Sequence, residues 1–157
     1  MMTKSKERLW RYGPLIVWLA FIAFASSVQF SAENTSRIIR PLLLWLFPNI
    51  SEARIAFVHV LTRKTAHFTE FAVLGLLSAR AFTVSSQYIL RRMWFFAGLF
   101  LVVIWALLDE FHQSFVPSRT ASFYDSLIDI AGGLTALIGY RYVRDRLRMK
   151  GLRQSRS

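Results

Sequence analysis

Residues 109–129, DEFHQSFVPSRTASFYDSLID, form a polar segment in an otherwise apolar part of the chain. Sixteen uncharged residues precede the segment and eleven follow it, while the segment itself contains four carboxylates, His112, Gln113 and Arg119. Uncharged runs of this kind are typical of membrane-spanning helices, because a helix rises about 1.5 Å per residue and the hydrocarbon core is roughly 30 Å thick. We therefore expect residues 109–122 to form a loop that connects two spans at one face of a membrane.

The composition of the whole chain agrees with a membrane protein. It has 157 residues, is 54% hydrophobic and has a mean hydropathy of +0.37, which is more apolar than an ordinary soluble domain. We expect an all-α membrane protein with four transmembrane helices, at residues 12–32, 65–84, 93–108 and 125–140. The third run is short, and we expect Tyr88, Ile89 and Leu90 to extend it if the two arginines that follow reach toward water.

The first apolar run follows Lys4, Lys6, Arg8 and Arg11, an order that is also typical of a secretory signal peptide. Its apolar stretch is longer than the roughly 7–15 residues of such a signal, and further spans follow it. We expect an uncleaved first helix.

The distribution of charge predicts the orientation in the membrane. With four spans, fourteen of the twenty Lys and Arg residues fall on the side of the two termini, whereas only Glu7 and Asp145 of the nine acidic residues do. The positive-inside rule then places both termini in the cytoplasm. We expect residues 1–145 to form a four-helix membrane domain and residues 146–157 to form a basic cytoplasmic tail.

The net charge of +11 is also compatible with nucleic-acid binding. The basic tail directly follows a span, however, and few aromatic residues are interleaved with it to stack on bases, so we expect anionic membrane lipids as its partner and no nucleic acid. The chain has no cysteine, which excludes disulfides and thiolate chemistry.

The segment between the first two spans contains an apolar stretch, residues 38–47, that is too short to cross a membrane. We expect it to lie at the outer interface as an amphipathic or re-entrant segment. Ser51 is a plausible N-cap for a helix that continues into the second span.

Ionisable residues occur inside two of the expected spans. Lys64, His67 and Glu70 recur every three residues and share one face of the second span. Such groups cost several kcal/mol in lipid unless they are paired or hydrated, so they should face the interior of the bundle.

The fourth span has a similar pattern. Asp125 and Asp129 lie on the same face as Gly132, Gly133 and Ala136, at the i, i+4, i+7 spacing of a helix. Small residues let helices approach closely, so the acids and a packing seam should share one side of this helix.

These two regions, RKTAHFTEFAVLGLL in the second span and DEFHQSFVPSRTASFYDSLIDIAGG around the fourth, resemble the VanZ-like family of small bacterial membrane proteins. The resemblance covers residues 14–140. It rests on Lys64, His67 and Glu70 together with Asp109, Glu110, Gln113, Pro117, Arg119 and Asp125. It implies a role in the cell envelope; the founding member is associated with low-level resistance to teicoplanin, and no catalytic activity is settled for the family. The family pattern often has asparagine where this chain has Asp129.

We expect one polar, ligand-binding site that opens to the outer leaflet and binds membrane lipid, a lipid-linked envelope precursor or a lipoglycopeptide. The candidate site residues are Lys64, His67, Glu70, Asp109, Glu110, Gln113, Arg119, Asp125 and Asp129. Arg119 should pair with at least one of the acids, because so many carboxylates would otherwise repel one another in a medium of low dielectric.

Two other functions fit the same residues. A metal-assisted hydrolase or transferase acting on a lipid-linked phosphate would use His67, Glu70, Asp109, Glu110 and His112. No metal signature is complete, so the sequence by itself predicts neither a metal nor another cofactor. A transporter or proton relay through Glu70, His67 and Asp129 is less favoured, because four spans without a repeat are few for a transporter unless the chain forms an oligomer.

Overall fold

The computed structural model describes residues 4–26, 32–115 and 122–154, and within these residues the chain forms helices and short turns without a strand. The described helices are α1 (Lys4–Ala25), α2 (Ala32–Leu46), α3 (Glu52–Thr83), α4 (Tyr88–Arg92), α5 (Trp94–Gln113) and α6 (Phe123–Gln154). The all-helical class predicted from the sequence is confirmed for the described residues.

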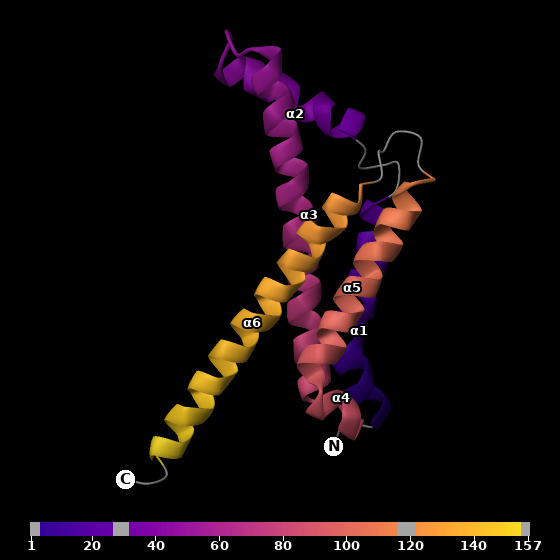
Figure 1. Ribbon diagram of the computed structural model, residues 1–157, viewed down its shortest axis with the longest axis vertical. Coiled ribbons are helices and arrows are strands. Elements are labelled where there is room, and N and C mark those ends of the chain that lie inside the picture. The colour runs from indigo at the N-terminus through magenta and orange to yellow at the C-terminus, as the bar shows by residue number, and fades with distance from the viewer. Residues whose placement is uncertain (1–3, 27–31, 116–121, 155–157) are drawn as a thin grey trace.

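Helix α3 is the centre of the arrangement, because α1, α5 and α6 all pack against it and α5 also packs against α6 (Figure 1). Helix α6 crosses α3 obliquely, and α2 lies across the upper end of α3 (Figure 1). Helix α1 begins and α6 ends at the lower end of the molecule in that view. Helix α5 therefore ends, and α6 begins, at the opposite, upper end of the molecule.

The crossing of α3 and α6 is closely packed because glycines line both sides of it. A Cβ atom at Gly75 would lie 2.5 Å from the backbone oxygen of Gly133, and one at Gly132 would overlap the carbonyl oxygen of Phe68. On its other side, Gly133 meets the side chain of Val102 on α5. The predicted small-residue seam is confirmed, and it lets the backbones of the two helices touch.

Apolar side chains fill the space between the helices below and around this crossing. Ile22 of α1, Phe71 and Leu74 of α3, Val102 of α5 and Leu137 of α6 are all fully buried. Ile22, Phe71, Leu74 and Val102 belong to one continuous core, and Ile130 of α6 packs against it.

Two side-chain hydrogen bonds tie α1 to this core. The indole N–H of Trp18 donates to the backbone oxygen of Glu70 at 2.9 Å, and Tyr12 shares a 2.7 Å hydrogen bond with Ser85. The first helix is therefore fastened to α3 near the middle of the bundle and to the turn after α3 at its lower end.

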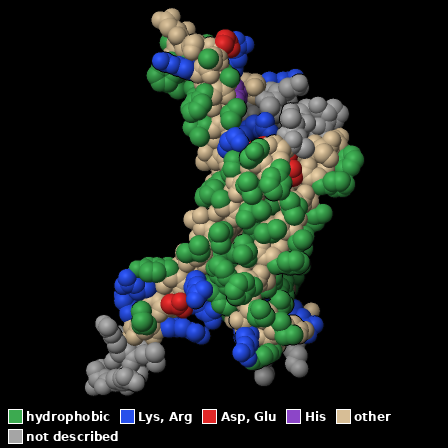
Figure 2. Space-filling model, viewed as in Figure 1, with side chains coloured by type: hydrophobic (Ala, Val, Ile, Leu, Met, Phe, Trp, Pro, Cys, Tyr) green, Lys and Arg blue, Asp and Glu red, His purple; other side chains and the backbone are tan. Residues whose placement is uncertain are grey.

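The outer surface of the bundle is strongly apolar (Figure 2). Large side chains such as Phe96, Phe100 and Phe111 of α5 are 63%, 68% and 64% exposed, which is unusual for a protein surrounded only by water. Among the described helices, α5 is the one that is long and apolar enough, by length and composition, to cross a membrane. Four spans and their orientation stay predictions.

The third expected span differs from the helix that the structure shows. Residues Tyr88–Arg92 form a separate short helix, α4, and a turn at Met93 divides it from α5. The expectation that Tyr88, Ile89 and Leu90 extend the span is wrong, because the chain turns there. Helix α5 gains its length at the other end, where it continues to Gln113 through residues that were expected to form a loop.

Other local expectations have clearer outcomes. Helix α3 runs from Glu52 to Thr83 without a break, so the predicted helix after Ser51 does continue into the second span; Ser51 occupies the N-cap position but makes no side-chain capping bond. The apolar segment between the first two spans belongs largely to α2, which continues through Pro41. Helix α6 passes through residue 145 without interruption, and the domain boundary predicted there stays a prediction.

We predict that Gly132→Ala destabilises the protein by about 1–3 kcal/mol, because the added methyl group must push α3 and α6 apart. Gly139→Ala is the matched control: it lies on the same helix, and nothing is within 4 Å of a Cβ atom there. The control should be neutral or slightly stabilising, since alanine favours helix by up to about 1 kcal/mol. Unfolding of both variants in mixed detergent micelles measures the difference, and equal stability would contradict the role of the seam.

Candidate functional site

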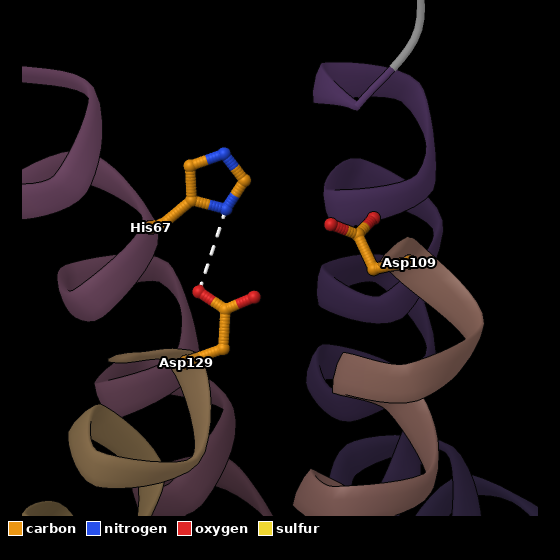
Figure 3. A group of neighbouring side chains, drawn as sticks. All are labelled: His67, Asp109 and Asp129. Atoms are coloured by element: carbon orange, nitrogen blue, oxygen red, sulfur yellow. Dashed lines mark ion pairs between the residues drawn. The ribbon is translucent and has the colours of Figure 1, made fainter. Parts of the chain in front are cut away.

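Three ionisable side chains from three different helices meet above the glycine crossing (Figure 3). His67 comes from α3, Asp109 from α5 and Asp129 from α6. Each offers one ligand atom, and these atoms all lie within 4.8 Å of one another. The closest pair is Nδ1 of His67 and Oδ1 of Asp129, which are 3.4 Å apart.

The position of this cluster follows from the helical register. His67 immediately precedes Phe68, whose carbonyl oxygen packs on Gly132, and Asp129 lies three residues before Gly132. Side chains on a helix point toward its N-terminus, so Asp129 points up from the crossing into the space beside His67. Close backbone approach at the glycines therefore brings the imidazole and the carboxylate together.

The two aspartates are deeply buried. Asp109 is 5% exposed and Asp129 is 1% exposed. Gln113, one turn further along α5, donates a 2.7 Å hydrogen bond from Nε2 to Oδ2 of Asp109. In contrast, Nδ1 of His67 and Oδ1 of Asp129 are both buried and make no hydrogen bond with any described residue. The two atoms form an ion pair when His67 is protonated. Buried polar atoms without a hydrogen bond are nevertheless rare and costly, so this pair requires a physical explanation.

A second charged pair lies toward the chain connection. Nζ of Lys64 on α3 is 2.8 Å from Oδ1 of Asp125 on α6, and both side chains are partly exposed. These residues also line a cavity of about 300 Å³, together with Arg63, His67 and Ser122. The cavity thus leads from an exposed ion pair inward to the imidazole.

A smaller cavity approaches the cluster from the side of α1 and α5. It measures about 190 Å³ and is lined by Asp109 and His112 and by three apolar residues, Ala23, Trp105 and Leu108. The cluster is therefore reached from two sides, one polar and one mainly apolar.

The structure brings together most of the residues predicted from the sequence. Lys64 and Asp125 form the outer pair, whereas His67, Asp109 and Asp129 form the inner cluster and Gln113 supports it. The interpretation of residues 109–113 as loop is wrong. They are the last turn of α5, and their helical spacing is what places Gln113 beside Asp109.

Two predicted residues lie outside these groups, and the structure does not describe a third. Glu110 accepts a hydrogen bond from the backbone N–H of Ser122 and so links the end of α5 to the start of α6. Glu70 is half-buried on α3 one turn from His67 and is not part of the three-residue cluster. Arg119, the cation expected to pair with the acids, lies outside the described residues, so its pairing stays a prediction.

Two residues without a predicted role also lie near the site. Arg63 lines the larger cavity. Ser126 is 1% exposed, and its hydroxyl has no hydrogen-bond partner among the described residues. Its position between Asp125 and Asp129 on one helix was the feature of the sequence that could have identified it as a site residue.

The sequence profile of the VanZ/LLP1 family matches residues 11–144, which include every helix that forms the core and all of the candidate site. The chain belongs to the VanZ/LLP1 family. The resemblance inferred from the second and fourth apolar segments is thereby confirmed. Neither a curated protein nor a solved structure matched the chain.

We predict that Gln113→Leu lowers the stability of this VanZ/LLP1 protein by about 1–3 kcal/mol, because the buried carboxylate of Asp109 loses its donor. Gln87→Leu is the control, since that side chain is exposed in the turn before α4 and should change stability by less than about 0.5 kcal/mol. Thermal unfolding in detergent compares the two. Equal stabilities would mean that Asp109 does not need the amide.

Proposed function

We propose that this VanZ/LLP1 protein is a multi-pass protein of the bacterial cytoplasmic membrane that binds the polar head of a lipid-linked envelope molecule from the outer leaflet. The proposal has two parts, the membrane topology and the ligand. Each is supported by different observations.

The topology is supported by where apolar and basic side chains lie. Apolar side chains cover much of the middle of the molecule, and basic side chains lie toward both of its ends (Figure 2). Arg92, Arg141, Arg144 and Arg148 meet at that end around one surface cavity. We assign this end to the cytoplasm by the positive-inside rule, with α1, α3, α5 and α6 as the four spans.

The depth of the site follows from the same assignment. His67 is thirteen residues above Arg80, which is about 20 Å of helix, and Asp129 is twelve residues above Arg141, about 18 Å. In a hydrocarbon core of roughly 30 Å, both would lie in the outer half, beneath the outer boundary. Charged groups at this depth are costly unless they serve a function.

The observation that carries the ligand proposal is the cavity of about 300 Å³ beside α3 and α6. It combines the cations Arg63 and Lys64 with the acceptor Asp125, and apolar helix surface surrounds it. A lipid-linked molecule has the matching chemistry, since its anionic head would enter the cavity while its apolar chain lies along the exposed side chains of the helices.

We predict that a polyprenyl phosphate raises the melting temperature of the purified protein, whereas the uncharged polyprenol of the same length does not. At a ligand concentration of 100 times Kd the stabilisation is about 2.7 kcal/mol. Lys64→Gln should weaken binding about tenfold, which corresponds to the loss of one charge-assisted hydrogen bond, and Arg146→Gln at the far end should not. Equal shifts with the phosphate and the alcohol would contradict recognition of the head.

A lipoglycopeptide such as teicoplanin presents the same combination of polar head and apolar chain. It is the second ligand to test in the same melting experiment, and deletion of the gene should increase the sensitivity of the host to it. A shift with teicoplanin but with no lipid precursor would identify the antibiotic as the ligand.

We also predict that reporters fused after Arg8 and after Arg144 are both cytoplasmic. Green fluorescent protein should fluoresce at both positions and alkaline phosphatase should be inactive, whereas a phosphatase fused after Phe115 should be active. An active phosphatase after Arg144 would contradict the assignment of α6 as the last of four spans.

A second function is favoured by the convergence of His67, Asp109 and Asp129, which is a common ligand set of metal-dependent hydrolases and transferases. In that case water attacks the phosphorus of the lipid-linked phosphate and its bond to the lipid oxygen breaks, giving a lipid alcohol and inorganic phosphate. Release of phosphate from the polyprenyl phosphate used above distinguishes an enzyme from a binder.

A further inference from the structure

We propose that His67, Asp109 and Asp129 bind one divalent transition-metal ion, of the kind represented by Zn²⁺ and Mn²⁺, at the point where α3, α5 and α6 meet. The inference does not depend on the proposed function, because it rests on the protein ligands alone. The sequence suggested five possible residues for a metal-assisted enzyme, whereas the proposed site consists of the three residues whose ligand atoms converge.

The first observation is the contact between His67 and Asp129. Nδ1 of the imidazole and Oδ1 of the carboxylate are 3.4 Å apart, and both atoms are buried, yet they do not form a hydrogen bond. Ligand atoms bound to one tetrahedral ion at about 2.1 Å lie about 3.4 Å from each other. The two atoms therefore already have the separation of neighbouring metal ligands.

The second observation is the placement of Asp109. Its carboxylate extends from α5 toward His67 and Asp129 (Figure 3), and the ligand atoms of the three residues all lie within 4.8 Å of one another. Gln113 donates to Oδ2, which fixes the orientation of the carboxylate and leaves its other oxygen for an ion. Metal-binding carboxylates are commonly held in this way by a neighbouring donor.

Charge gives the third argument. Two buried carboxylates beside one imidazole leave an excess of negative charge, and buried charge must be compensated. A protonated His67 offsets one of these charges through its pair with Asp129, and Lys64 is already engaged by Asp125. A divalent cation compensates both aspartates, and it also accepts the lone pairs of the unbonded atoms of His67 and Asp129.

The ligand types select the class of ion. One imidazole nitrogen and two carboxylate oxygens suit Zn²⁺ and Mn²⁺, whereas Ca²⁺ and Mg²⁺ prefer oxygen alone and Cu⁺ prefers sulfur. Three protein ligands leave at least one position of the ion open, as in sites that bind or activate a further molecule rather than purely structural sites. The cavity that His67 lines lies on the side of Lys64 and gives access to that position.

The test uses the full chain without a histidine tag, purified in detergent and stripped of metal with EDTA. Titration calorimetry with ZnCl₂ and separately with MnCl₂ should show one ion bound per chain. His67→Gln, Asp109→Asn and Asp129→Asn should each weaken binding by more than Gln113→Leu, for which the expected loss is about 10–100-fold. Asp145→Asn removes an exposed carboxylate far from the cluster and should bind as tightly as the unsubstituted chain.

A second measurement needs no variant, so it stays decisive if the substituted chains do not fold. X-ray absorption of the zinc-loaded protein should show a first shell of nitrogen and oxygen with the scattering pattern of one imidazole. A zinc shell without imidazole, less than a tenth of an equivalent of either ion at saturation, or undiminished binding in folded His67→Gln and Asp129→Asn overturns the proposal. None of these results concerns lipid, so they leave the ligand proposal to its own experiment.

Discussion

The arrangement of this protein depends on the contact between the backbones of α3 and α6 at Gly75, Gly132 and Gly133. Helices separated by ordinary side chains lie 8–10 Å apart, whereas glycines allow a closer approach. The closer approach has a specific consequence one turn above the crossing, where the short side chain of Asp129 reaches the ring of His67. The same crossing positions Val102, and with it the upper turns of α5 that carry Asp109. One packing contact therefore sets the geometry of a site built from three helices.

Burying charged side chains is unfavourable by itself. The structure offsets this free-energy cost separately in an outer pair, Lys64 and Asp125, and in an inner cluster, His67, Asp109 and Asp129. At the outer layer Lys64 and Asp125 neutralise each other and remain partly hydrated. In the inner layer Gln113 satisfies one oxygen of Asp109. The remaining polar atoms of His67 and Asp129 face each other as an ion pair without a hydrogen bond, so the inner layer is the least satisfied part of the described site. Natural proteins commonly depart from full satisfaction of buried groups at functional sites.

The periodicity of the sequence predicted which faces of the helices carry the site. It did not predict which residues along those faces lie at the same height in neighbouring helices. The three-residue spacing of Lys64, His67 and Glu70 places all three toward the interior, yet His67 rather than Glu70 joins the two aspartates. That choice depends on how far each helix slides along its neighbour, which is set by the glycine contact and cannot be derived from one helix alone. The end of α5 was missed for a related reason. Charged residues such as Asp109 and Glu110 suggest the end of a span, although a helix continues through them when hydrogen-bond donors satisfy their carboxylates.

The two layers of charge also connect the proposed ligand with the proposed ion. An anionic head that enters the cavity meets Lys64, whose charge is already offset by Asp125, and behind it the carboxylates of Asp109 and Asp129. Without an additional positive charge these inner carboxylates would repel the head, because the screening that weakens such repulsion in water is small in a buried site. A divalent ion at the inner layer reverses the sign of the local field and leaves an open position for an anionic oxygen. The cavity would then attract phosphate through the ion and orient it through Arg63 and Lys64, and the outer pair and the inner cluster would act as one site.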